Sequence, residues 1–159
     1  MARVNGHALA GGFGLAVACD ITICVDDAKL GTTEVKVGLW PMMISAVLAR
    51  SMPPKAVLEM MLTGRIITPD EALRLGGVSR VVPRDQLDTA VNEVVESLLA
   101  ASPTTLMMGK DAFYGIVGTD LDTAFDRLQG GLTEIAMTED AREGVAAFIE
   151  KRAPKWSGR

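Results

Sequence analysis

The chain has 159 residues, of which 48% are hydrophobic and 4% aromatic, and its length suits a compact domain. A formal net charge of −4 argues against general nucleic-acid binding, and no apolar run approaches the roughly 20 residues of a membrane span. Two cysteines, Cys19 and Cys24, do not make a disulfide scaffold, so we expect reduced thiols and, with no secretory signal at the start, a cytoplasmic location.

Residues 1–50 alternate strand, glycine turn, helix, strand, loop and helix, which is typical of an α/β fold with a buried sheet. Four glycines within residues 6–14 leave backbone amides accessible where the first helix begins. A helix start carries unpaired N–H donors and a partial positive charge, so it can stabilise a developing oxyanion. Glu34, which follows the strand at residues 21–25, could move a proton beside it.

After Met52 the sequence is nearly all helical. Prolines at residues 53–54 predict a helix that ends at residues 63–64, because proline suits a first turn. Thr68 and Glu71 predict a capping box that opens a short helix, and Gly76 and Gly77 close it. Residues 78–83 follow as an extended segment, and a longer amphipathic helix is expected to begin at Asp85.

Residues 102–152 are predicted to form helices only. Ser102 is expected to cap a helix that ends near residue 118, and two further helices are expected over residues 121–137 and 138–152. We therefore predict an α/β region over residues 1–100 and a helical region over residues 101–159 that packs on itself or on another subunit. The basic residues at 151–159 either meet a small phosphate ligand or lie at a helix C-terminus for structural reasons.

Nucleotide-binding loops do not match the glycine segment. It lacks the lysine of a P-loop and the third spaced glycine of a dinucleotide fingerprint. Tight packing of a helix on a sheet is the structural alternative for these glycines. His7 has no cysteine or acidic cluster at metal-ligand spacing, so we expect it to be structural or exposed, and we expect no metal site.

Several ordered motifs run through the chain: Asn-Gly-x-Ala-x-x-Gly-Gly at residues 5–12, Leu-Gly-x-x-Glu at 30–34, Leu-Thr-Gly-Arg at 62–65 and Arg-Glu-Gly at 142–144. Together they closely resemble the crotonase family, the enoyl-CoA hydratases and isomerases. The resemblance implies a crotonase-like α/β fold, a partial ββα spiral core with a helical C-terminal trimerisation region. It also implies a homotrimer or a dimer of trimers, and it begins in the middle of a family subunit.

The resemblance implies a site for an acyl-CoA thioester, with CoA as part of the substrate and no other cofactor. The Gly11 amide and a second donor upstream of this chain would polarise the carbonyl, and one such donor is typically worth about 10²–10³ in rate. Glu34 would carry the proton. Substrate contacts are implied for Gly12, Gly14, Trp40, Pro41, Met42, Phe148 and Lys151, with packing as the alternative for Phe148, Trp40 and Met42.

Two departures from the family pattern bear on the chemistry. Gly14 stands where hydratases of the family carry a glutamate, so only Glu34 remains, and each acid–base group is worth roughly 10²–10⁴. One carboxylate suffices to move a proton between two carbons, which favours isomerisation, with slow hydration possible. The loop after Pro41, normally glycine-rich, holds bulky residues at 42–45 that either line an acyl pocket or fill the core.

A second hypothesis is a non-catalytic assembly module that keeps the oligomerising helices but lacks half of the site. The region missing upstream and Gly14 favour it, whereas Gly11, Gly12 and Glu34 count against it. RNA binding is a weaker third option, because the body is acidic and shows no basic, aromatic-bearing face.

Overall fold

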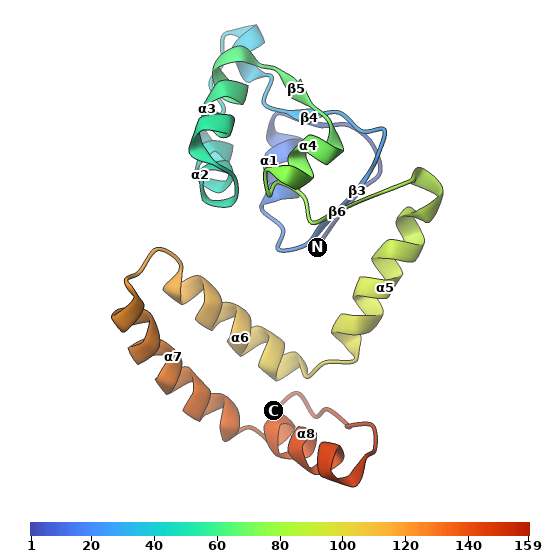
Figure 1. Cartoon of the computed structure of the whole chain (residues 1–159), viewed down its shortest axis with the longest axis vertical. Coiled ribbons are helices and arrows are strands. Elements are labelled where there is room, and N and C mark those ends of the chain that lie inside the picture. Colours follow the sequence, from blue (N-terminus) through green and yellow to red (C-terminus); the bar gives the residue numbers. More distant parts are fainter. The chain divides into compact units, whose positions relative to one another are not determined.

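A computed structural model describes the whole chain, Met1–Arg159. Its contacts group the residues into two compact units, Met1–Val94 and Val95–Arg159 (Figure 1). This division falls within helix α5, slightly before the one expected from the sequence at residues 100 and 101. The roles assigned to the two regions stay predictions. None of the helices has the length and apolar character needed to cross a membrane.

The first unit contains a parallel sheet in the order β1-β3-β6, formed by Ala2–Val4, Thr22–Val25 and Arg80–Val82. All four residues of the central strand β3 are buried, as expected for a parallel sheet covered on both faces. Cys24 pairs with Val4 on one side and Val81 on the other.

A second sheet has the order β2-β4-β5, formed by Ala8–Leu9, Leu30–Gly31 and Ile66–Ile67. Strands β2 and β4 are parallel, and β4 and β5 are antiparallel. The first unit therefore has the predicted α/β character, with strands β2 and β4 leading directly into the two segments that the sequence marked as functional.

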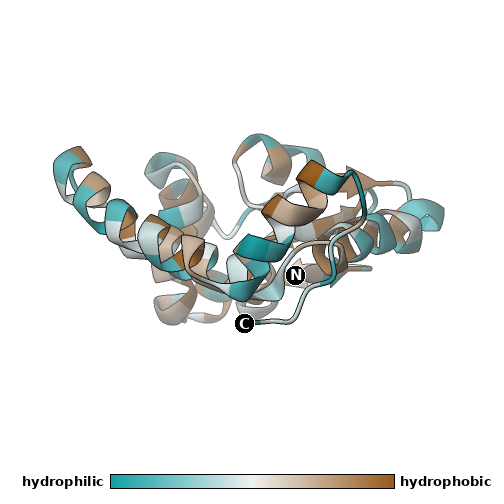
Figure 2. Cartoon of the chain, turned by 90° about the horizontal axis from the view of Figure 1, so that it is seen from below, coloured by the Kyte–Doolittle hydropathy of each residue, from teal (hydrophilic) through white to brown (hydrophobic).

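The helical elements of the first unit are α1 (Gly11–Val17), the 3₁₀ helix η1 (Glu34–Val37), α2 (Met42–Ser51), α3 (Pro54–Thr63), α4 (Pro69–Arg74), the 3₁₀ turn η2 (Arg84–Gln86) and the part of α5 (Leu87–Leu99) up to Val94. Figure 2 shows that the helices carry both hydrophobic and hydrophilic residues. Their apolar sides meet the sheets in one core, whose largest fully buried apolar side chains include Phe13, Ile23, Leu30, Leu48, Met60 and Ile67.

Three local features of the first unit differ from the sequence prediction. The segment after Pro41, expected as a loop, is the first turn of α2, because the Pro41 carbonyl accepts the Ser45 N–H at 3.0 Å. The capping box at α4 is only half formed: the Thr68 hydroxyl accepts the Glu71 N–H at 3.2 Å, but the Glu71 carboxylate binds Arg65 instead of reaching back. The helix predicted from Asp85 begins at Leu87, after η2.

The second unit contains α6 (Pro103–Ile116), α7 (Leu121–Ala136) and α8 (Glu139–Glu150). Each begins with a side-chain cap that accepts the backbone N–H of the residue three positions later. The caps are Ser102, Asp120 and Thr138, and the donors are Thr105, Thr123 and Ala141. Helix α8 is shorter than predicted, because Thr138 lies outside it as the cap and Lys151 ends it with a left-handed backbone, φ 54°.

Asp140, in the first turn of α8, binds both the start of α6 and the end of the chain. Its buried carboxylate accepts the Ser102 hydroxyl at 2.6 Å, the Ser157 N–H at 2.7 Å and the Gly158 N–H at 3.2 Å, while its own N–H donates to the Arg159 carbonyl at 2.9 Å. The chain end therefore folds back onto the start of α6 through this residue, and the Trp156 Nε1–H adds a bond to the Ala100 carbonyl at 2.8 Å.

Candidate functional site

The start of α1 presents free backbone donors. The N–H groups of Phe13 and Gly14 donate to the Ala10 carbonyl at 3.0 and 3.3 Å, whereas those of Gly11 and Gly12 have no acceptor within the chain. Both glycines are exposed, and a Cβ built on either would meet nothing within 4 Å. These two amides can therefore donate to an oxygen atom of a ligand.

Glu34 lies just after β4, as the first residue of η1. Its Oε2 atom is buried and has no hydrogen-bond partner, and the same is true of the Thr32 hydroxyl two residues earlier. Buried polar atoms are nearly always paired, because leaving one unpaired costs free energy. Sequence reasoning found Glu34 but missed Thr32, since nothing local marks a threonine at a strand end.

Strand pairing brings the segments of Gly11 and Glu34 to the same edge of the second sheet. Strands β2 and β4 run parallel with Leu9 opposite Gly31, and the Ala10 N–H donates to the Gly31 carbonyl at 2.8 Å. The chain leaves both strands at their carboxyl ends, where ligands bind in open α/β sheets. Glu34 is the only acidic residue between residues 28 and 58, so this edge carries one local carboxylate.

Gly14 faces α2 rather than open space. It is buried, and a Cβ added to it would overlap the Cγ2 atom of Ile44. Helix α1 contains no acidic residue, and this contact closes the position where hydratases of the family carry a second glutamate. The sequence identified Ile44 only as a bulky residue after Pro41, since its contact with Gly14 joins residues that are 30 positions apart in the chain.

The predicted substrate contacts after η1 differ in exposure. Pro41 is buried at the start of α2, whereas the side chains of Trp40 and Met42 are 39% and 72% exposed. Neither exposed side chain fills the core of the first unit. Their roles as substrate contacts stay predictions.

In the second unit, Phe148 is 85% exposed and Lys151 is exposed just beyond α8. Packing within this unit therefore does not account for Phe148. No contact in the structure assigns either residue to a CoA nucleotide, and that role stays a prediction.

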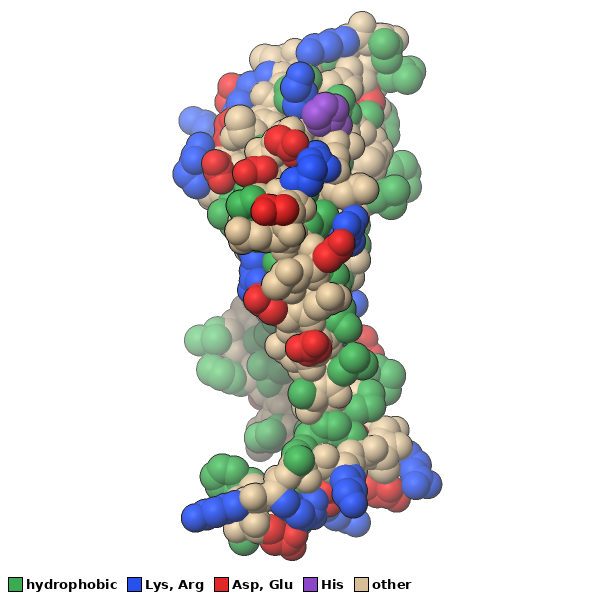
Figure 3. Space-filling model, turned by 90° about the vertical axis from the view of Figure 1, so that its right-hand side faces the viewer, with side chains coloured by type: hydrophobic (Ala, Val, Ile, Leu, Met, Phe, Trp, Pro, Cys, Tyr) green, Lys and Arg blue, Asp and Glu red, His purple; other side chains and the backbone are tan.

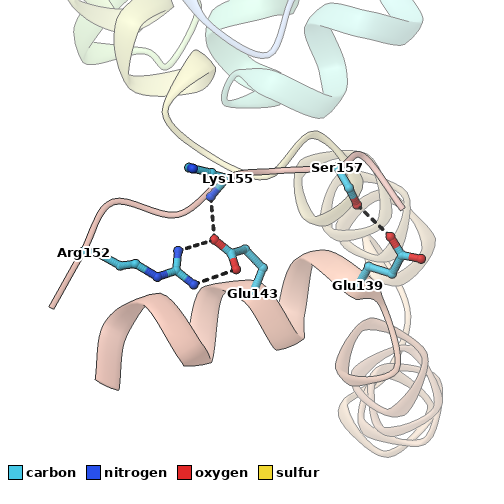
Figure 4. Close-up of a pocket in the computed structure, with 5 residues that line it drawn as sticks. All are labelled: Glu139, Glu143, Arg152, Lys155 and Ser157. Carbon is cyan, nitrogen blue, oxygen red and sulfur yellow. Dashed lines mark hydrogen bonds and ion pairs between the residues drawn. The ribbon is translucent and has the colours of Figure 1, made fainter. Parts of the chain in front are cut away.

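A polar cavity of about 360 Å³ lies beside α8 and is lined by Glu139, Glu143, Arg152, Lys155 and Ser157 (Figure 4). Arg152 donates two hydrogen bonds to the Glu143 carboxylate, at 2.6 and 2.9 Å, and the Lys155 N–H adds a third at 2.7 Å. These bonds lower the pKa of Glu143 to about 2, chiefly through Arg152. The basic chain end is thus held by acids of its own unit, which favours its structural interpretation over a phosphate site.

His7 and the two cysteines are the remaining candidate residues. The Nδ1 atom of His7 accepts the Lys29 N–H at 3.1 Å. No group of three or more histidine, cysteine or acidic side chains is placed to hold a metal ion. Cys19 and Cys24 are free thiols, and burial, followed by the charge of Asp27, raises the pKa of Cys24 to about 11.

Comparison with known proteins gives consistent matches. Residues 1–159 match the family model described as enoyl-CoA hydratase/isomerase. The chain is 37% identical over 157 residues to the mitochondrial enoyl-CoA hydratase domain-containing protein 3 of Rattus norvegicus, covering 99% of the chain and 52% of that protein. It is 35% identical over 164 residues to the carnitinyl-CoA dehydratase of Salmonella typhi, covering 100% and 63%.

Solved structures show the same likeness. An enoyl-CoA hydratase from Mycobacterium smegmatis superposes with a TM-score of 0.92 at 35% identity, covering 97% of this chain and 60% of that one. Human enoyl coenzyme A hydratase domain-containing protein 3 gives 0.93 at 35% identity, covering 97% and 61%. These matches confirm the predicted fold class. The chain spans about half the length of the rat relative that it matches.

Proposed function

Because this chain belongs to the enoyl-CoA hydratase/isomerase family, as its motifs indicated, we propose that the protein containing it acts on acyl-CoA thioesters through an enolate. The observation that carries the proposal is the pairing of β2 with β4. It places free amides of Gly11 and Gly12 and the buried, unpartnered Glu34 carboxylate oxygen at one sheet edge. CoA enters as part of the substrate, and no further cofactor is proposed.

In the proposed reaction, the Gly11 N–H donates to the thioester oxygen, with a second donor from outside this chain. This bond stabilises the negative charge that develops when the carbon next to the carbonyl loses a proton. Glu34 accepts that proton and returns it to the γ-carbon, so that the double bond moves from the 3,4 to the 2,3 position. No water is added and no net proton is consumed.

The contact between Gly14 and Ile44 supports isomerisation over hydration. Adding water across a double bond uses a base for the water and an acid for the carbon, and each is worth roughly 10²–10⁴ in rate. Ile44 occupies the space that a side chain at residue 14, the position of the second glutamate in hydratases of the family, would need. We therefore propose that hydration is at most a slow side reaction.

Exposed apolar side chains suggest how substrate and subunits are held. Trp40 and Met42 lie beyond η1, and a flexible methionine suits acyl tails of varied length.

In the second unit an apolar groove of about 720 Å³ lies between α6 and α7, and Figure 3 shows hydrophobic side chains exposed on one face of the molecule. We propose that α6 to α8 assemble subunits into a homotrimer or a dimer of trimers. A cytoplasmic location also remains a proposal, because the rat relative is named as mitochondrial.

The test is a parallel assay of 3-enoyl-CoA and 2-enoyl-CoA with the purified protein, its Glu34→Gln variant and a Glu96→Gln control on the exposed face of α5. We expect turnover of the 3-enoyl substrate, a loss of about 10²–10⁴ in Glu34→Gln and no change in the control. Brisk hydration of the 2-enoyl substrate would contradict the one-carboxylate mechanism. No turnover from a folded oligomer would favour the assembly module.

A further inference from the structure

The turn after α3 is fixed by its own hydrogen bonds. The Thr63 hydroxyl donates to the Glu59 carbonyl at 2.7 Å and accepts the Arg65 N–H at 3.2 Å. Between them, Gly64 ends α3 with a left-handed backbone, φ 63°, a conformation that glycine adopts without strain. The turn therefore leaves α3 in a single defined direction.

This turn contacts the residues on both sides of Glu34. A Cβ at Gly64 would lie 3.0 Å from Cγ1 of Val35 and 2.9 Å from Cε of Lys36. A Cβ at Gly31 would lie 2.8 Å from the Arg65 carbonyl oxygen, where β4 pairs with β5. Both approaches are closer than side chains normally permit, so residues 64–66 press directly against the segment that carries Glu34.

Arg65 ties the turn to two helices. Its guanidinium donates to Oε1 of Glu71 on α4 at 2.7 Å, and its Nε lies 3.1 Å from Oε1 of Glu59 on α3 without forming a hydrogen bond. Arg65 and Glu71 are partly buried, which screens their pairing less than a fully exposed pair. The Arg65 side chain thus fixes the start of β5 between α3 and α4.

We infer that Arg65 is a positioning residue for Glu34, acting through the turn at residues 63–66. The Oε2 atom of Glu34 has no hydrogen bond of its own, so its position depends on the backbone of the segment that carries it. That backbone is held by β2 on one side and by the Arg65 turn on the other. The catalytic part of this inference rests on the proposed function.

Hydrogen exchange tests the positioning without any assay of activity. The N–H groups of Lys36, Gly38 and Leu39 bond to carbonyls of residues 33–35 and report on the Glu34 segment. In Arg65→Gln we expect these amides to exchange about tenfold faster while the amides of β3 are unchanged. Arg80→Gln, which removes the Arg80–Glu93 ion pair of the same unit, is the matched control and should leave the exchange of the Glu34 segment unchanged.

A second measurement separates positioning from overall stability. In Arg65→Gln we expect kcat for the 3-enoyl substrate to fall about tenfold with KM nearly unchanged, since a small misplacement of a catalytic group affects the reacting state most. Arg65→Lys, which keeps the charge, should recover most of the kcat.

The inference is overturned if the Glu34 segment exchanges at the wild-type rate in Arg65→Gln, or if β3 loosens equally. It is also overturned if kcat of Arg65→Gln equals the wild-type value although the amides of the Glu34 segment exchange faster. If the wild-type protein turns over no enoyl-CoA, the proposed function fails, and the exchange experiment still decides whether Arg65 holds the segment.

Discussion

Gly14 of α1 and Ile44 of α2 lie in direct contact, so close that a Cβ on Gly14 would overlap the Ile44 side chain and lie 3.6 Å from its Cα atom. The absence of a side chain at residue 14 is what permits α1 and α2 to pack at this distance. The same contact removes the space for a side chain at residue 14, where a second carboxylate would otherwise stand. One glycine therefore bears on both the packing and the chemistry of the sheet edge.

Gly14→Ala should destabilise the first unit by about 1–3 kcal/mol, because the added methyl group overpacks the contact with Ile44. Urea denaturation followed by circular dichroism measures the loss. Gly12→Ala in the same helix is the matched control for stability, since its Cβ would meet nothing within 4 Å. Equal stability of the two variants would show that Ile44 moves aside freely.

Glu143 should stabilise the second unit in a pH-dependent way. Its bonds to Arg152 lower its pKa to about 2 in the folded state, from an ordinary value of 4.5. A lowered carboxyl pKa contributes stability that is present above the ordinary value and is lost as pH falls toward the folded one. The difference in unfolding free energy between wild type and Glu143→Gln should therefore shrink from pH 5 to about pH 2. An equal difference in unfolding free energy at pH 5 and at about pH 2 would contradict the stabilising role of Glu143. Glu134→Gln, exposed on α7, serves as the control.

Asp140→Asn should destabilise the second unit more than Asp122→Asn, an exposed position in the first turn of α7. The carboxylate of Asp140 accepts bonds from the Ser102 hydroxyl and from the amides of Ser157 and Gly158, and an amide side chain cannot accept them all. The Ser102 bond chiefly lowers the pKa of Asp140, so the difference should also diminish in acid. Thermal unfolding of the two variants checks this, and equal melting temperatures would contradict it.

Cys24 should resist thiol reagents in the folded protein. Burial raises its pKa to about 11, and the thiolate is the reactive form. Cys19 is partly exposed and should react first. Alkylation at pH 8 followed by peptide mass analysis should find Cys19 labelled and Cys24 labelled only after denaturation. Rapid labelling of both in the folded protein would contradict the packing of β3.

Leu132→Glu should weaken the proposed subunit assembly. Leu132 is 70% exposed and lines the apolar groove between α6 and α7, and a carboxylate there resists burial in an apolar interface. Light scattering coupled to size-exclusion chromatography measures the mass in solution. A wild-type monomer, or a variant that assembles as the wild type does, would contradict the role given to this groove. Asp126→Asn, exposed on the same helix, is the control.

Local chemistry made several features predictable. The predicted cap at Ser102 acts within three residues, and Gly64 ends its helix through its own backbone conformation. The helix ends at Pro54 and Thr63 follow the predicted signals, as does the α/β order of residues 1–50. The sequence also marks Glu34 as the one acidic residue in its region, because that needs only the order of residue types.

Contacts between distant residues were beyond such reasoning. Ile44 closes the space at Gly14, Arg65 presses on the Glu34 segment from thirty residues away, and Asp140 gathers donors from both ends of its unit. Each depends on strand register and on the direction in which helices leave their turns, neither of which is encoded in a short window. The sequence by itself determined the order of most elements, the cap at Ser102 and the identity of the lone carboxylate. Only the tertiary structure decided which segments pack against the one that carries that carboxylate, since long-range packing sets the space that each can occupy.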